Sequence, residues 1–385
     1  MARRIAVGVE YLSDYRAGIA RVGTDLFKAL KATDRHTEYI LVANREMPLD
    51  YRYNIQPDKQ LQQSGSYQKL PDLIALPFWV QFQLPRILSQ LEIDLYLHTG
   101  TPPLLPLFPP WSKIKKIIFL HDLINVKSPR FFKPITFIHG SVAKWMALRS
   151  FDRILCNSMA TKSDAVKLLK ANPEKITVIH LGISEAFQKL PSPEAVLRAR
   201  TMVGGDDLPF VLFVGTIEPR KNLEGLLHGF KVSGLNDNHR LVVVGAKGWM
   251  TSNISRLIRK LELDEAVILC GFVSDEELSA LYRSAAVFCY PSFDEGFGLP
   301  VLEAMACGCP VIASGIPAIR EVGGEVPTYI NPKSSQSIAA ALREVAENKL
   351  ARDSMARRGM ERASSYTWDR AALDVCKVMD TVIRH

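Results

Sequence analysis

The chain of 385 residues is longer than a single hydrophobic core usually supports, so its length predicts two domains with a cleft between them. Its 47% hydrophobic and 23% charged residues are typical of a globular protein and argue against disorder. The formal charge of +8 lies in the first half: residues 1–190 carry 26 Lys or Arg against 16 Asp or Glu, whereas residues 191–385 carry 22 against 24.

The basic first half suits an acidic partner such as a lipid phosphate or an anionic membrane surface, although a scattered excess also describes a solvated face. Nucleic acid is disfavoured because no recognised nucleic-acid-binding motif accompanies the charge. No Cys-x-x-Cys pair occurs, and Cys307 and Cys309 have no nearby histidine, which predicts reduced thiols and no zinc site. Without an apolar run of 18 residues or a signal peptide, we expect a cytoplasmic protein.

Short apolar segments alternate with amphipathic ones from end to end, the pattern of βα units that build parallel sheets. Residues 43–75, rich in polar residues, are expected to form an irregular loop. The predicted strands are 5–9, 39–42, 95–97, 117–120, 153–156, 210–214, 241–244, 267–269, 287–290 and 311–313, with early helices near 18–32, 81–91, 137–149 and 158–171.

The segment Leu-Pro-Ser-Pro at 190–193 predicts a domain boundary, because prolines halt regular structure. We expect an N-terminal Rossmann-like domain at 1–191 and a C-terminal one at 192–365. Residues 366–385 are apolar at helical spacing, so they form either a helix that crosses back to the first domain or one that packs on the second. Ligands of such sheets bind at the carboxyl ends of the strands.

Glu295 and Glu303 flank a turn with Gly296 and Gly298, followed by Pro300 at the expected start of a short helix near 300–307. The amides and dipole of a helix N-terminus attract phosphate, and Glu303, placed in the first turn, could accept hydrogen bonds from a ribose diol. The alternative is that Glu303 only complements the helix dipole and that Glu295 is a solvated loop residue.

Three other segments follow predicted strands and carry polar groups. Arg220 and Lys221 suit a diphosphate, or are surface charges at a helix entry. Gly18 opens a predicted helix and brings backbone amides close to a phosphate. His121 follows the strand at 117–120, where an imidazole is either catalytic or structural.

Together these segments resemble the retaining glycosyltransferases of family 4, which have the GT-B fold: two Rossmann-like α/β domains that face each other across a cleft. The resemblance covers nearly the whole chain and is most specific from Glu295 to Ala306. Its other motifs are Ala-Gly-Ile-Ala-Arg at 17–21, His-Asp-Leu at 121–123, Pro-Glu-Lys-Ile-Thr-Val-Ile at 173–179, Gly-Thr-Ile-Glu-Pro-Arg-Lys-Asn at 215–222 and Val-Gly-Ala-Lys-Gly-Trp at 244–249.

The resemblance implies that Glu303 holds the ribose of a nucleotide-sugar and that Glu295 contacts hydroxyls of its sugar. Arg220 and Lys221 then neutralise the departing diphosphate, and His121 lies beside the transferred sugar. No metal or other cofactor is expected, because preorganised cations and helix amides can stabilise the leaving group and no Asp-x-Asp motif occurs. The further donor-binding residues implied are Gly18, Gly215, Thr216, Lys247, Gly271, Phe272, Val273, Phe297, Gly298 and Leu299.

The function implied is retaining transfer of a hexose to a glycan or lipid-linked acceptor in polysaccharide biosynthesis, with mannose from GDP-mannose as the leading candidate. The alternatives are a sugar-nucleotide 2-epimerase of the same fold and a non-catalytic nucleotide-sugar-binding protein. Residues 127–149, where Phe131, Phe132, Phe137 and Trp145 stand among basic residues, fit peripheral contact with the inner face of an anionic membrane, or core packing with a solvated face.

Overall fold

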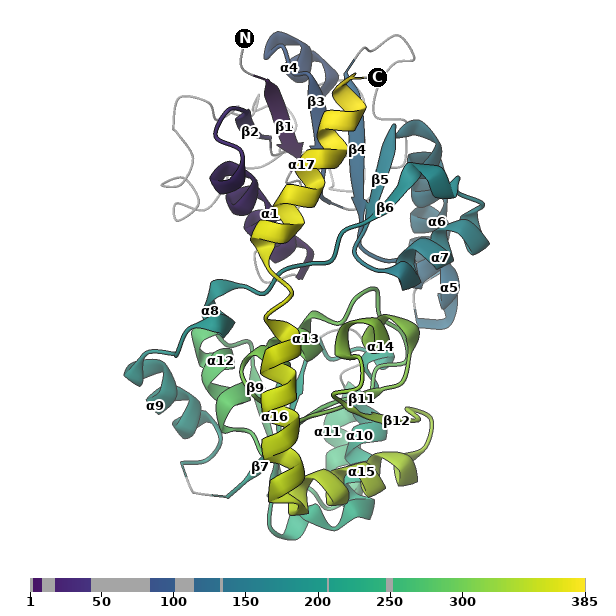
Figure 1. The fold of residues 1–385 in the computed structure, drawn as a ribbon. Helices are drawn as coiled ribbons and strands as arrows, with labels where there is room; N and C mark the ends of the chain where they lie inside the picture. Colours follow the sequence, from purple (N-terminus) through teal and green to yellow (C-terminus); the bar gives the residue numbers. More distant parts are fainter. Residues whose placement is uncertain are drawn as a thin grey trace, which may run out of the picture. The chain divides into compact units, whose positions relative to one another are not determined.

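The computed structural model of the chain describes residues 3–8, 18–42, 84–100, 114–131, 134–205, 208–246 and 252–384. These residues form two compact units (Figure 1). The first combines Met1–Gly182 with Thr367–His385, and the second is Ile183–Tyr366. Each unit is built around its own six-stranded parallel sheet covered by helices, which confirms the predicted pair of Rossmann-like α/β domains. The predicted loop at 43–75 lies outside the described residues.

The sheet of the first unit has the order β2-β1-β3-β4-β5-β6, and all its strands pair in parallel. The three residues of β6 had not been predicted, because so short a strand has no recognisable pattern. The strands are β1 Arg4–Gly8, β2 Glu38–Val42, β3 Leu95–His98, β4 Lys115–Leu120, β5 Arg153–Cys156 and β6 Ile176–Val178. The helices are α1 Gly18–Thr33, α4 Leu84–Gln90, α5 Ile124–Lys127, η4 Pro129–Phe131, α6 Pro134–Ser150, α7 Met159–Leu169, η5 Pro173–Lys175 and α17 Trp368–Arg384.

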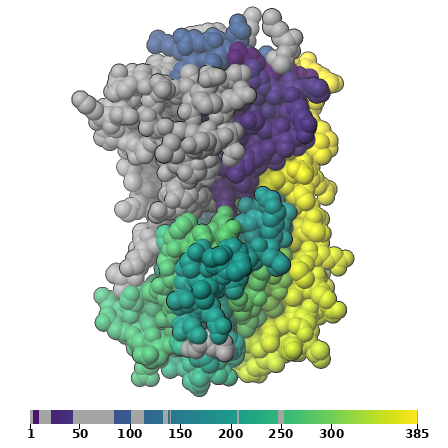
Figure 2. Space-filling model, turned by 90° about the vertical axis from the view of Figure 1, so that its left-hand side faces the viewer, coloured from purple at the N-terminus to yellow at the C-terminus, as the bar shows by residue number. Residues whose placement is uncertain are grey.

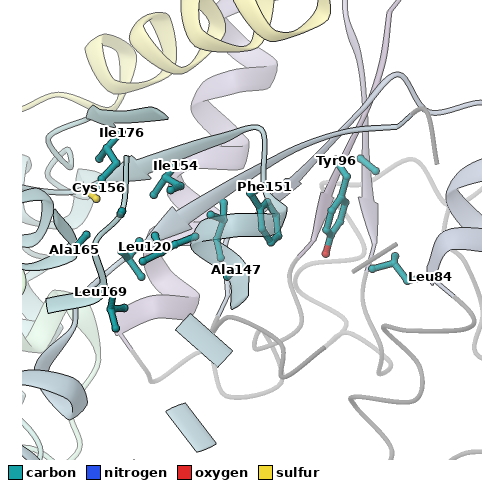
Figure 3. Packing of buried hydrophobic residues seen from close by; sticks show 14 of the residues in the cluster. Leu84, Tyr96, Leu120, Ala147, Phe151, Ile154, Cys156, Ala165, Leu169 and Ile176 are labelled. Carbon is teal, nitrogen blue, oxygen red and sulfur yellow. The ribbon is translucent and has the colours of Figure 1, made fainter. Parts of the chain in front are cut away.

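One hydrophobic cluster of the first unit joins the sheet to the helices α4, α6 and α7 (Figure 3). Phe151, which lies between α6 and β5, and Ile154 of β5 pack in the same buried cluster as Leu120 of β4 and Ala147 of α6. Burying such apolar side chains contributes roughly 1.5–3 kcal/mol each for the larger ones.

The sheet of the second unit has the order β12-β11-β10-β7-β8-β9. Its first strand, β7, is central, and the chain then builds outward to β9 on one side and to β12 on the other. The strands are β7 Phe210–Val214, β8 Arg240–Val244, β9 Val267–Gly271, β10 Val287–Tyr290, β11 Val311–Ser314 and β12 Thr328–Ile330. The helices are α8 Glu185–Gln188, α9 Pro193–Met202, η6 Pro219–Lys221, α10 Leu223–Ser233, η7 Leu235–Asp237, α11 Ser252–Lys260, α12 Asp275–Ser284, α13 Leu299–Ala306, α14 Pro317–Gly323, α15 Ser335–Glu347 and α16 Lys349–Ala363.

This strand order places the topological switch point of the second unit between β7 and β10. At that point the connections leave in opposite directions, and the loops that follow the two neighbouring strands diverge. In doubly wound sheets the space between those loops is where ligands bind. The switch point therefore marks the residues that follow Val214 and Tyr290 as the first place to look for a site.

The C-terminal helix α17 belongs to the first unit. It packs on α1, and the Cys376 sulfur lies 3.7 Å from the Tyr39 hydroxyl oxygen. Figure 2 shows these yellow C-terminal residues against the purple N-terminal ones. The chain passes between the units at Gly182 and again after Tyr366, whereas the predicted boundary was at residue 191. The Ser-Pro pair at 192–193 instead begins α9, where the Ser192 hydroxyl accepts a hydrogen bond from the amide of Ala195.

Candidate functional site

The loops after β7 and β10 are tied to each other at the switch point of the second unit. The amide of Phe293 donates to the carbonyl oxygen of Arg220 at 2.9 Å. Asn222, in the left-handed region with a φ of 59°, caps α10 and donates from its side chain to the carbonyl of Pro291 at 3.1 Å. These bonds hold the Arg220–Lys221 segment beside the loop that carries Glu295.

A buried charge cluster occupies this position. Lys221 Nζ lies 2.8 Å from one carboxylate oxygen of Glu295, and Arg220 Nη1 lies 2.9 Å from the other. The Tyr290 hydroxyl donates to the first oxygen at 2.8 Å, and Lys221 also donates to Tyr290. Arg220 further pairs with Glu218 and donates to the carbonyl of Asp294 at 2.8 Å. The sequence analysis assigned the two cations to a diphosphate and Glu295 to a sugar. The structure pairs both cations with the Glu295 carboxylate.

The cluster holds Glu295 in its charged form. Burial would raise the pKa of this carboxyl, but the charges of Arg220 and Lys221, with hydrogen bonds from Lys221 and Tyr290, outweigh it and lower the pKa to about 2. Burial also raises the pKa of Tyr290 well above its ordinary value, so its hydroxyl stays a donor at neutral pH. Glu295 is therefore a fixed anion, and the alternative of a solvated loop residue is wrong.

Glycines let the strand ends of this sheet approach each other. Gly215 and Gly245 have φ values of 147° and 146°, and a Cβ on Gly245 would lie 2.0 Å from the Gly215 carbonyl oxygen. A Cβ on Gly215 would only touch the aliphatic part of Lys221, at 3.5 Å, so the φ of 147° rather than a lack of space favours glycine at this position. Thr216 is exposed beside it. Lys247, which follows β8, lies outside the described residues.

The helix α13 begins one residue earlier than predicted, at Leu299, and this changes the place of two residues. Pro300 is the second helical residue, and Glu303 lies beyond the first turn, which contains no acidic residue. The Glu303 side chain is 3% exposed. The expectation that Glu303 sits in the first turn is therefore wrong. Gly298, just before the helix, has a φ of 105°, which favours glycine, and α13 has no side-chain cap hydrogen bond, so its N-terminus remains suited to an anion.

The remaining residues predicted for donor binding in the second unit differ in exposure. Phe297 is buried and meets the ring of Tyr366 edge-on at 6.2 Å, whereas Leu299 is half-buried. Gly271 ends β9 with a φ of 70°, and the next residue, Phe272, exposes 49% of its surface. Val273 is buried.

The first unit has its own polar chain at the ends of β1, β3 and β4. His121 Nε2 lies 2.7 Å from the carbonyl oxygen of Thr99, and the Thr99 hydroxyl donates to the carbonyl of Gly8 at 2.8 Å. Asn157 donates to the carbonyl of His121 at 2.8 Å. Burial lowers the pKa of His121, so the imidazole is neutral at pH 7 and Nε2 carries the proton given to Thr99. Gly18 begins α1 in the same unit.

Several residues of these clusters were not predicted. Tyr290, Glu218 and Thr99 each stand at or just after a strand end, which is the one signal that the sequence offered for them. Lys144 is buried in α6 and donates to Asn125 at 2.6 Å and to Asp122 at 3.2 Å. Among the described residues, no group of three or more His, Cys, Asp or Glu side chains is arranged to hold a metal ion.

Comparison with known proteins covers both units. Residues 16–187 match the family described as Glycosyltransferase Family 4, and residues 203–362 match Glycosyl transferases group 1. O-antigen chain mannosyltransferase B of Escherichia coli is 31% identical over 66% of this chain and 67% of its own length. O-antigen chain mannosyltransferase RfbU of Salmonella typhimurium is 30% identical over 56% of this chain and 58% of its own length. The match to the mannosyltransferase WbdA of Escherichia coli spans 32% of that protein.

Solved structures show the same fold. HepE of Anabaena, in complex with UDP and glucose, superimposes with a TM-score of 0.77 over 98% of this chain and 100% of its own, at 18% identity. WaaG, a glycosyltransferase involved in lipopolysaccharide biosynthesis, gives a TM-score of 0.73 over 96% of this chain and 98% of its own, at 17% identity.

Proposed function

Because this chain belongs to the glycosyltransferases of family 4, which have the GT-B fold, we propose that it moves a hexose from a nucleotide-sugar to a glycan or lipid-linked acceptor, with retention of configuration. The donor that we propose first is GDP-mannose, and the process is polysaccharide biosynthesis. Two relatives with about 30% identity, both O-antigen chain mannosyltransferases by name, support mannose over other hexoses.

The observation that carries this proposal is the cluster of Arg220, Lys221 and Glu295 at the switch point. In hexose transfer the bond from the anomeric carbon to the diphosphate breaks, and negative charge develops on the leaving oxygens. Arg220 and Lys221 can stabilise that charge because their loops already hold them in place, so that only their side-chain contacts with Glu295 have to be shared with the diphosphate. We propose that this electrostatic stabilisation replaces a metal ion.

Glu295 has two roles in this proposal. Its carboxylate holds the side chains of the two buried cations in place, and it accepts hydrogen bonds from hydroxyls of the donor sugar. A diphosphate that reaches Arg220 and Lys221 has to share them with Glu295, so the Glu295 carboxylate is freed in part to face the sugar. The acceptor hydroxyl then attacks the anomeric carbon on the same face, and its proton passes to the leaving diphosphate.

The other residues complete the donor site as the family resemblance implies. Glu303 binds the ribose, the amides of Phe297, Gly298 and Leu299 lie near the sugar and phosphates, and residues 271–273 line the base. Gly18 adds a backbone contact to the diphosphate, Gly215 and Thr216 lie beside it, and Lys247 is a further donor contact. His121 lies beside the transferred sugar.

A screen of donors tests the proposal. The melting temperature of the purified chain is measured with GDP-mannose and with UDP-, ADP- and dTDP-sugars, since a ligand of the native state raises it. Release of nucleoside diphosphate is then measured with and without a glycan acceptor, and with EDTA. Lys221→Met is compared with Arg198→Gln, which breaks an ion pair with Glu277 away from this cluster.

We expect GDP-mannose to raise the melting temperature of the native chain and of Arg198→Gln but not of Lys221→Met. Acceptor-dependent release of GDP, unaffected by EDTA, completes the expected result. Turnover that needs no acceptor would assign the chain to the epimerases, and binding without any turnover would make it a binding protein. If no nucleotide-sugar shifts the melting temperature, the donor site is wrongly assigned.

A further inference from the structure

The hydroxyl of Tyr290 lies between two charged groups of the second unit, and the proposed chemistry gives it no role. Tyr290 is the last residue of β10 and is completely buried. Its hydroxyl donates to Oε1 of Glu295 at 2.8 Å and accepts a hydrogen bond from Nζ of Lys221. The same ammonium group lies 4.9 Å from the centre of the Tyr290 ring. The hydroxyl is thus bonded to the carboxylate and to one of its cations at once.

The two oxygens of the Glu295 carboxylate have different partners. Oε1 is bound by Lys221 at 2.8 Å and by the Tyr290 hydroxyl at 2.8 Å. Oε2 is bound by Arg220 at 2.9 Å. Among the contacts of Glu295 in the described part of the chain, Tyr290 therefore supplies the neutral one, and it supplies it to a single oxygen.

A bound diphosphate affects the charged and the neutral partners of Glu295 differently. It carries more negative charge than one carboxylate, so it attracts Arg220 and Lys221 towards itself. The lysine side chain can follow, because its ammonium group stands on a flexible stem of four carbons. A neutral hydroxyl is attracted much less strongly. Of the three partners of Glu295, the hydroxyl is the one that the donor leaves in place.

The position of the Tyr290 hydroxyl is also fixed by packing. The ring stacks on Phe288 with 5.6 Å between the ring centres, and the backbone of Tyr290 is paired with Ala313 of β11. The hydroxyl oxygen lies in the plane of the ring, so it moves only if the buried ring moves. It therefore keeps its place while the lysine and arginine side chains adjust.

We propose that Tyr290 is a positioning residue for Glu295, whose hydroxyl keeps hold of Oε1 while the diphosphate draws Lys221 and Arg220 away. Oε2, which Arg220 then leaves, is the oxygen that accepts a hydrogen bond from the donor sugar. A hydrogen bond to an ionised carboxylate is strong and favours the charged form, which is the form that a sugar hydroxyl needs as its acceptor. The inference rests on the proposed function, because it requires a donor diphosphate.

The variant that tests the proposal is Tyr290→Phe, because it keeps the buried ring and removes only the hydroxyl. The matched control is Tyr329→Phe, in which another tyrosine of the same unit loses a hydrogen bond, the one to the carbonyl of Gly324 at 2.6 Å. Melting temperatures show that both variants are folded. The measurements are kcat as a function of pH, the affinity for GDP and for UDP by calorimetry, and a double-mutant cycle.

The pH profile separates a positioning role from a structural one. Tyr290→Phe should lower kcat about tenfold and change the affinity for GDP less than about twofold, because the hydroxyl acts on Glu295 rather than on the diphosphate. Loss of the donor raises the pKa of Glu295, so the acid limb of the kcat profile should move up by about one pH unit. Tyr329→Phe should change neither. The other charged groups of the cluster and its loop, which both variants retain, are Arg220, Lys221, Glu218 and Asp294.

The double-mutant cycle needs no turnover. Tyr290→Phe, Glu295→Gln and the double variant are unfolded in urea at pH 7, with and without saturating GDP. We expect the two substitutions to be coupled about threefold in the unfolding equilibrium constant without GDP and about tenfold with it, because the hydroxyl matters most once the cations have moved.

The outcomes distinguish this inference from the proposed function. If the native chain transfers sugar but Tyr290→Phe behaves like Tyr329→Phe, or if the coupling does not grow with GDP, Tyr290 is only structural and the inference alone is overturned. If the native chain binds GDP without turning over any donor, the proposed function fails and the GDP-dependent coupling decides the inference. If neither GDP nor UDP binds, both are wrong.

Discussion

Lys221 and Glu295 form a buried ion pair across the switch point of the second sheet, with 2.8 Å between Nζ and a carboxylate oxygen. They come from the loops after β7 and β10, and Arg220 joins the same carboxylate from the other side at 2.9 Å. The two groups best suited to a diphosphate are therefore paired with the carboxylate proposed to face the sugar. A donor must compete with Glu295 for the two cations, and this competition determines what substitutions there should do.

Glu295→Gln should lower kcat at least tenfold, because the amide keeps the shape but loses the charge that orients Lys221 and meets the sugar. Binding of free nucleoside diphosphate should be retained or become tighter, because its competitor for the cations is gone. Rate measurements and calorimetric titration check this pair of effects. Glu218→Gln is the matched control, since Glu218 pairs with Arg220 alone in this cluster and should affect kcat less. Equal activity of Glu295→Gln and the native chain would contradict the role of Glu295.

The low pKa of Glu295 makes stability depend on pH. Its folded pKa of about 2 lies below the ordinary value of 4.5, so the charged form stabilises the fold at pH values above about 4.5. This stabilisation, about 3 kcal/mol, is lost as the pH falls from 4.5 towards 2. The difference in urea unfolding between the native chain and Glu295→Gln should be largest at pH 7, shrink below pH 4.5 and vanish only as the pH approaches 2. A difference that stays constant over this range would refute the assignment.

Glu303→Ala should weaken nucleotide binding about tenfold or more, if the carboxylate holds the ribose as proposed. Because Glu303 is buried in α13, the same change also removes packing, so Glu303→Gln is the needed companion. The amide keeps the volume and one acceptor, and should lose less affinity. Titration calorimetry with GDP and a melting curve for each variant separate the two effects. Affinity unchanged in Glu303→Ala would remove Glu303 from the site.

Thr99→Val should lower kcat several-fold and the free energy of unfolding by about 1 kcal/mol, since it removes the hydrogen bond to the Gly8 carbonyl. Thr99 acts through its own carbonyl, which accepts from His121, so this is a positioning effect. The pKa of His121, followed by NMR, is the decisive measurement and should move in Thr99→Val but not in Thr99→Ser. If neither kcat nor that pKa changes, Thr99 is only structural.

Gly182→Ala should destabilise the chain by about 1–3 kcal/mol. Its Cβ would lie 2.2 Å from the backbone nitrogen of Trp368 and 2.7 Å from the carbonyl carbon of Thr367, and backbone atoms cannot move aside cheaply. Gly205→Ala, whose Cβ meets no atom within 4 Å, gives the cost of alanine in a left-handed turn without a clash. Chemical unfolding of the two variants should rank Gly182→Ala as the less stable.

Much of the fold was predictable because parallel strands that are buried on both faces are continuous apolar runs. The strands at 117–120, 153–156, 210–214 and 287–290 were found by this pattern alone, and β4, β5, β7 and β10 agree with them closely. The three-residue strands β6 and β12 escaped because nothing in so few residues distinguishes a strand from a loop. The start of α13 was missed by one residue because Pro suits both of the first two positions of a helix.

The sequence by itself determined that two parallel α/β units exist, that the chain belongs among the glycosyltransferases, and that Arg220, Lys221 and Glu295 stand at strand ends. Short stretches of sequence are enough for these conclusions, because buried strands and turns are recognised from the types of neighbouring residues. Only the tertiary structure decided that the two cations pair with Glu295 and that His121 gives its proton to Thr99. Those relationships join residues far apart in the chain, and strand order and packing, rather than spacing, bring them together.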